Sequence, residues 1–146
     1  SWKGGYWESQ KKAKALGIEN WLPIFERGAL CVNLQYGDTT ADENLIKERG
    51  YELVSFPQVD FKSKLDDWLA ISAACDGIIS VSTALVHFAG ACGQKVGIVM
   101  PEPQGPWILG IDDEWSIAYP NVAFFRRNRD ESVTELVDRV AKVIVA

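Results

Sequence analysis

Residues 80–93, SVSTALVHFAGACG, constrain the fold of this chain more than any other segment, because they lie between apolar runs at residues 77–79 and 96–100. This order fits a strand, a short polar turn, a helix and a second strand. Strands that alternate with helices form parallel sheets covered on both faces, and such sheets bind ligands beyond the carboxyl ends of their strands. The segment therefore predicts a doubly wound, Rossmann-like α/β fold and the edge of the sheet where a ligand would bind.

The rest of the chain continues this alternation. We expect strands at residues 29–35, 51–56, 77–82, 96–100 and 122–126, and helices at residues 20–26, 41–49, 63–75 and 130–145 besides the short helix that begins at Thr83. Helical spacing places Leu65 and Val143 on the inner faces of their helices. A Pro-, Gly- and Trp-rich loop at residues 101–120 is long enough to be functional.

Composition indicates one globular domain over residues 1–146, with 47% hydrophobic and 24% charged residues. No segment approaches the ~20 apolar residues of a membrane-spanning helix, and a net charge of −5 argues against a nucleic-acid surface. Three cysteines without C-x-x-C spacing predict reduced core residues of a cytoplasmic protein. With one histidine besides, they provide no cluster of metal ligands. The opening glycine loop lacks the apolar strand that should precede it, so we expect a fragment of a longer protein.

The polar turn is the best candidate for a binding site. Ser82 and Thr83 end the third strand, Thr83 can cap the helix that follows, and Ser82, Thr83 and Ala84 are the candidates for ligand contacts at this turn. A helix N-terminus with free N–H groups binds phosphate or pyrophosphate. His87 lies one helical turn past Thr83, on the same face. The alternatives are a plain capping role for Thr83 and a structural role for His87.

Three further residues are candidates for ligand contacts. Lys3 lies beside the flexible pair Gly4-Gly5, where it is either a phosphate contact or a solvated lysine. Gln35 ends the first strand and would face the same crevice, where it holds a ribose or base or belongs to a turn. Trp107, in the long loop, would stack on a base or sugar, cover the sheet edge or dock a partner domain.

The motif resembles a known family. Residues 80–93, with Lys95-Val96 and the strand end at residues 99–101, are similar to the donor-domain signature of glycosyltransferase family 9, which includes the heptosyltransferases, and especially to members attached to tetratricopeptide repeats. The similarity covers nearly the whole chain in the family's order. Further matching segments are residues 1–5, residues 33–38, Trp107, Trp115, residues 119–120 and residues 125–127. Many heptosyltransferases carry Asp where this chain has Ser82, and relatives often have Gln in place of Arg127.

The resemblance implies the C-terminal donor-binding domain of a metal-independent GT-B glycosyltransferase. Its substrate would be a nucleotide-diphosphate sugar, without any cofactor. The helix N-terminus at Thr83 and the Lys3 ammonium would stabilise the departing nucleoside diphosphate, and the catalytic base would belong to an N-terminal acceptor domain outside this chain. Two alternatives stay open: a non-catalytic nucleotide-binding or protein-interaction module, which Ser82 favours, and another GT-B enzyme such as a sugar-nucleotide epimerase.

Overall fold

The structure is a computed structural model of the 146-residue chain, and it describes residues 1–5, 15–101 and 114–146. Its strands form two parallel groups. β1 (Cys31–Val32) pairs with β2 (Leu53–Val54), while β4 (Lys95–Met100) lies between β3 (Gly77–Val81) and β5 (Val122–Arg126).

Helices alternate with these strands along the chain. They are η1 (Ile18–Trp21), α2 (Leu22–Phe25), α3 (Thr40–Glu48), α4 (Leu65–Ala73), α5 (Ala84–Ala91) and α6 (Val133–Ile144). The predicted doubly wound, Rossmann-like α/β fold is confirmed. None of the helices in the described part is long and apolar enough to cross a membrane.

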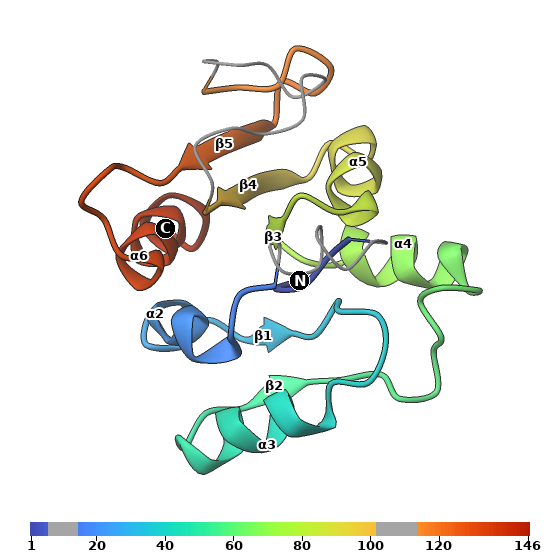
Figure 1. The fold of residues 1–146 in the computed structure, drawn as a ribbon. Coiled ribbons are helices and arrows are strands. Elements are labelled where there is room, and N and C mark those ends of the chain that lie inside the picture. Colours follow the sequence, from blue (N-terminus) through green and yellow to red (C-terminus); the bar gives the residue numbers. More distant parts are fainter. Residues whose placement is uncertain (6–14, 102–113) are drawn as a thin grey trace.

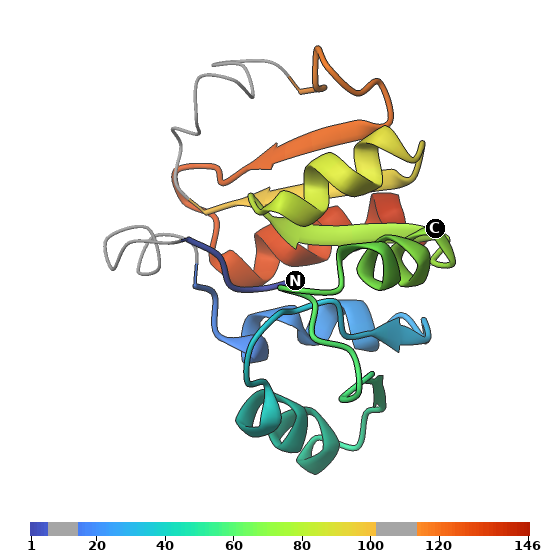
Figure 2. The same cartoon turned by 90° about the vertical axis from the view of Figure 1, so that its right-hand side faces the viewer.

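The two faces of the larger sheet carry separate cores. On one face, Val96, Ile98 and Met100 of β4 pack with Leu85 of α5 and Trp68 of α4. On the other face, Val99 packs with Val137 and other apolar residues of α6. Alternate residues of a strand point to opposite faces, so β4 serves both cores. Figure 2 shows α4 and α5 on one side of the strands and α6 on the other.

Glycine at position 97 brings α6 close to the sheet. A Cβ atom added there would lie 2.7 Å from Val140 Cγ1 and 2.9 Å from Ile144 Cγ1. Both separations are shorter than the distances at which Cβ atoms contact other heavy atoms in proteins. α6 can therefore pack this close to β4 only because Gly97 has no side chain.

Several boundaries and burial predictions were wrong. β1 and β2 are two residues long each, much shorter than the predicted strands. After Val32 the Asn33 side chain accepts a hydrogen bond from Gln35 N at 2.8 Å, which is turn chemistry and not strand pairing. Leu65 and Val143 are 44% and 42% exposed. Helical spacing indicates which side of a helix is apolar. Whether a side chain on that side is buried depends on whether a neighbouring strand or helix extends far enough to cover it. Cys92, expected in the core, is exposed at the end of α5.

The first residues of the chain connect the two groups of strands. The Ser1 amine donates to Ile79 O at 3.0 Å, and Val81 N donates to Ser1 O at 3.0 Å. This is the pattern of a parallel bridge to β3. Figure 1 shows the segment between β3 and β1, so that the spatial order is β2, β1, the N-terminal segment, β3, β4 and β5.

Candidate functional site

Three segments meet at the carboxyl edge of the strands: residues 1–5, the turn after β1 and the turn after β3. Gly4 packs against the turn after β3. A Cβ atom added to Gly4 would lie 2.7 Å from Thr83 Cγ2 and 3.5 Å from the Ser82 carbonyl oxygen. The structure therefore brings the glycine loop beside Lys3 against the N-terminus of α5, as the fold predicts.

Thr83 is the N-cap residue of α5 by position, with extended backbone at φ −132° and ψ 173°. Its side chain makes no capping hydrogen bond, so that part of the sequence prediction is wrong. Instead, Thr83 Oγ1 lies 3.2 Å from Ser80 Oγ. Because Ser80 Oγ donates to Val81 O at 2.7 Å, the Thr83 hydroxyl is the donor of that pair.

The first turn of α5 consequently receives no acceptor from its N-cap side chain. Ala84, the first helical residue, is exposed. Val86 N bonds the Thr83 carbonyl oxygen at 3.2 Å. Backbone N–H groups at a helix start carry partial positive charge, so this end of α5 suits an anion better than a capped end would.

Gln35 holds the N-terminal segment in place. Its Oε1 atom accepts hydrogen bonds from Ser1 Oγ at 2.8 Å, Trp2 N at 3.0 Å and Lys3 N at 2.9 Å. Its Nε2 atom donates to Tyr36 O at 3.1 Å, and the residue is only 5% exposed. Both polar ends of the side chain are thus occupied by the chain itself, and Gln35 positions the loop that carries Lys3.

The Lys3 ammonium pairs with the Asp42 carboxylate at the start of α3. Asp42 also accepts from Trp2 Nε1 at 3.1 Å. The Lys3 side chain is 41% exposed, so its ammonium stays within reach of solvent. A ligand would compete with Asp42 for it. Asp42 was missed by sequence reasoning, because its 39-residue separation from Lys3 leaves no local signal.

Asn33 is a second residue that sequence reasoning missed. Its buried amide donates to Thr39 Oγ1 at 3.0 Å and to Glu43 Oε1 at 2.8 Å. Thr39 Oγ1 in turn donates to Glu43 at 2.6 Å. The sequence feature that could have indicated this role is a polar residue directly after an apolar strand. This network fixes the turn that presents Gln35.

The remaining predicted residues lie around α5 or outside the described residues. His87 is exposed, and its ring contacts that of Tyr119 with centroids 5.9 Å apart and planes at 66°. The contact with the segment before β5 is what a structural histidine would make. Ser82 is half-buried at the end of β3. Trp107 lies outside the described residues.

The fold and the geometry define a Rossmann-like α/β domain with a polar, anion-compatible edge at the ends of β1 and β3. No family model matches the sequence, and no solved structure matches the chain. Among curated proteins, the chain is similar to protein FlbA of Caulobacter vibrioides, with 32% identity over 126 residues. The matched region covers 85% of this chain and 21% of FlbA, so the chain spans about a fifth of that relative's length.

Proposed function

We propose that this chain is the donor-binding domain of a metal-independent, heptosyltransferase-like GT-B glycosyltransferase that acts in the cytoplasm. The observation that supports this function is the approach of Gly4 to Thr83 at the N-terminus of α5, where the Thr83 side chain makes no capping hydrogen bond. Close backbone approach beside a helix N-terminus is the arrangement that suits a diphosphate. The resemblance to glycosyltransferase family 9 supplies the sugar and the reaction class.

In this proposal the diphosphate oxygens accept hydrogen bonds from the backbone at Thr83 and Ala84. The Lys3 ammonium exchanges Asp42 for the diphosphate. During transfer, the acceptor's nucleophilic atom forms a bond to the anomeric carbon while the bond from that carbon to the diphosphate oxygen breaks, and that oxygen keeps the electron pair. The helix N-terminus and Lys3 stabilise the developing negative charge. A base on an N-terminal acceptor domain, outside this chain, removes the acceptor proton.

The other predicted residues have supporting roles. Gln35 keeps Lys3 in position through its bond to Lys3 N. Ser82 shapes the turn, while His87 and Trp107 contact the nucleotide or the sugar. For His87 the proposal requires a ligand on the exposed side of α5, one turn beyond Ala84.

Thermal unfolding in the presence of ADP, UDP or GDP tests the proposal. A nucleoside diphosphate at about 100 times its dissociation constant should stabilise the fold by ~2.7 kcal/mol, a rise of several degrees in melting temperature. Lys3→Ala and Ala84→Trp should each reduce the rise, the first by removing charge and the second by blocking the helix start. Lys47→Ala is the matched control, because Lys47 is exposed on α3.

Failure of all three nucleotides to change the melting temperature at millimolar concentration would contradict donor binding. It would then favour the protein-interaction module. Exposed apolar side chains support that second candidate, since Trp115 and Ile117, two residues apart in the segment before β5, are 55% and 88% exposed. Exposed apolar patches are among the features that mark protein interaction surfaces.

A further inference from the structure

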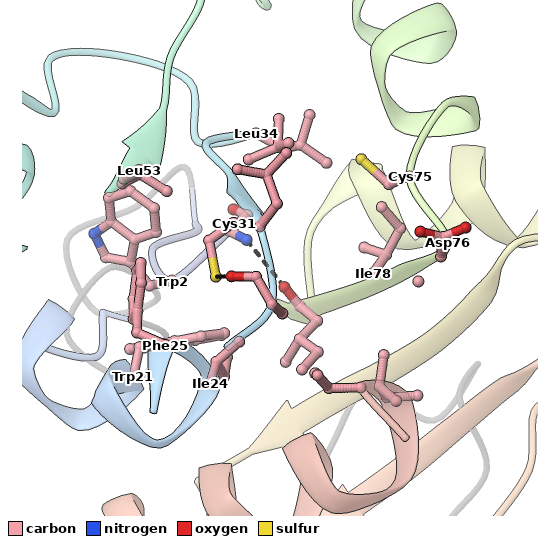
Figure 3. Close-up of a pocket in the computed structure, with 18 of the residues that line it drawn as sticks. Trp2, Trp21, Ile24, Phe25, Cys31, Leu34, Leu53, Cys75, Asp76 and Ile78 are labelled. Atoms are coloured by element: carbon pink, nitrogen blue, oxygen red, sulfur yellow. Dashed lines mark hydrogen bonds between the residues drawn. The ribbon is translucent and has the colours of Figure 1, made fainter. Parts of the chain in front are cut away.

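A groove of about 540 Å³ separates β1 from β3. Figure 3 shows Cys31 and Leu34 on the β1 side, facing Cys75 and Ile78 on the β3 side. Apolar residues of three helical elements also line it, among them Ile18, Trp21, Ile24, Phe25 and Ile144. The groove is therefore an apolar gap in the middle of the strand order, covered by helices.

Both sides of the groove are strand edges. The N–H and C=O groups of one strand residue point to the same side, and those of its neighbours point to the other. Because Ile79 O and Val81 N bond Ser1, the Ile79 N–H and the Gly77 C=O also point away from β4, into the groove. On the opposite side, Asn33 N bonds Val54 O of β2, so the N–H and C=O of Val32 point into the groove.

Ser1 occupies one end of the groove, and its contacts on both sides show that one extended strand fits between β1 and β3. Its amine and carbonyl complete two rungs of a parallel ladder with β3, while its hydroxyl reaches Gln35 beyond β1. One extended segment thus spans from the β3 edge to the residues that follow β1. Burial lowers the pKa of the Ser1 amine from 8.0 to about 5. A peptide N–H would make the same bond to Ile79 O without a charge to desolvate.

We propose that the groove is a slot for one extended peptide strand, parallel to β1 and β3, formed by the residues of a longer chain that lead directly into Ser1. Ser1 lies opposite Ser80, so the residue two positions before Ser1 lies opposite Ile78. Four residues, at ~3.3 Å each, reach the level of Asp76 at the start of β3. With this strand in place, β2, β1, β3, β4 and β5 belong to one continuous sheet.

The position of Ser1 selects this occupant over a free peptide or a second copy of the chain. Ser1 already pairs with β3 at the carboxyl end of the groove, opposite Ser80. The last residue of any occupant must therefore lie directly before Ser1. A covalently continuous strand meets that condition and has a high effective concentration at the slot. Apolar side chains line both faces of the slot: those of η1, α2 and α6 lie on one face, and Leu34 and Ile78, which pack with Trp68 of α4, lie on the other. The strand should therefore be rich in Val, Ile and Leu without polar alternation.

Adding five residues before Ser1 tests the slot. The probe is the 146-residue chain extended by Val-Ile-Val-Ile-Val, and the matched control carries Gly-Ser-Gly-Ser-Gly. Hydrogen exchange at the Ile79 and Val32 amides should slow by about tenfold or more in the probe alone. Thiol labelling of Cys31 and Cys75, which line the groove, should also slow, whereas the exposed Cys92 should react unchanged. Equal exchange and labelling in the two extended chains would overturn the proposal.

A disulfide tests the register independently of stability. In a background with Cys31, Cys75 and Cys92 changed to Ser, Ile78→Cys should cross-link to a cysteine two positions before Ser1, because neighbouring parallel strands hold such residues within disulfide reach. A cysteine three positions before Ser1 points to the other face and should not cross-link. Equal cross-linking at both positions, or none, would refute the parallel register. The free peptide Val-Ile-Val-Ile-Val is a further control. If it slowed hydrogen exchange and thiol labelling in the groove while the same residues attached before Ser1 did not, the proposal of a covalently continuous strand would be wrong.

Discussion

Replacing Gln35 with leucine should detach the N-terminal segment from the sheet. Gln35 Oε1 is the shared acceptor for Ser1 Oγ, Trp2 N and Lys3 N, at 2.8 to 3.0 Å. Leucine has a similar size, so the change removes the acceptor without opening a large cavity. Two peptide N–H groups then lose their partner in a region where Trp2 is buried.

The expected loss follows from these two groups. An unsatisfied buried donor costs about 1–3 kcal/mol. The cost for Trp2 N should lie in the upper part of that range. The cost for Lys3 N should lie in the lower part, because Lys3 is half-exposed and water can replace the lost hydrogen bond. The free energy of unfolding should fall by about 2–4 kcal/mol. For a domain of this size the melting temperature should fall by roughly 5–15 °C.

Urea unfolding followed by tryptophan fluorescence measures the free energy, and Gln58→Leu is the control because Gln58 is exposed. The control should change stability by less than about 0.5 kcal/mol. Gln35→Leu should also weaken nucleotide binding, since Lys3 loses its anchored backbone. A variant as stable as the control would refute the view that Gln35 holds the segment.

Three further outcomes follow from packing, capping and ionisation. In the 146-residue chain, which has a free amine at Ser1, the unfolded form takes up a proton at that amine before the folded form does as pH falls from about 8 to about 5, so the free energy of unfolding should fall by at most about 4 kcal/mol. Acetylating the amine should abolish that component of the pH dependence, and an unchanged pH profile would contradict it. Gly97→Ala should cost about 1–3 kcal/mol in urea unfolding because its Cβ would meet Val140; a neutral result would mean that α6 packs farther from β4. Ser132→Ala should cost about 1 kcal/mol, since Ser132 caps α6 in a capping box, whereas Thr83→Ala should cost less without ligand because Thr83 makes no capping bond; equal losses would refute this distinction.

The edge of the sheet that carries the candidate site was predictable, but its hydrogen bonds were not. The polar turn after the third strand indicated where Thr83 would lie, and parallel topology placed the Gly4 loop and Gln35 at the same edge. The partners of those residues come from distant elements. Asp42 on α3 forms an ion pair with the Lys3 ammonium, and Gln35 accepts hydrogen bonds from three groups of the N-terminal segment. No spacing in the sequence encodes such contacts.

The alternation of strands and helices, and hence the doubly wound class, follows from the amino-acid sequence alone. Apolar runs and helical periodicity are local properties, and they predicted β5 at residues 122–126 and placed α3 within one residue at each end. Tertiary structure decided what each element meets. It left Leu65 and Val143 exposed, reduced β1 to two residues and placed Ser1 between β1 and β3. Local pattern states which side of an element is apolar, whereas burial, strand pairing and the groove depend on surfaces supplied by residues far away in the chain.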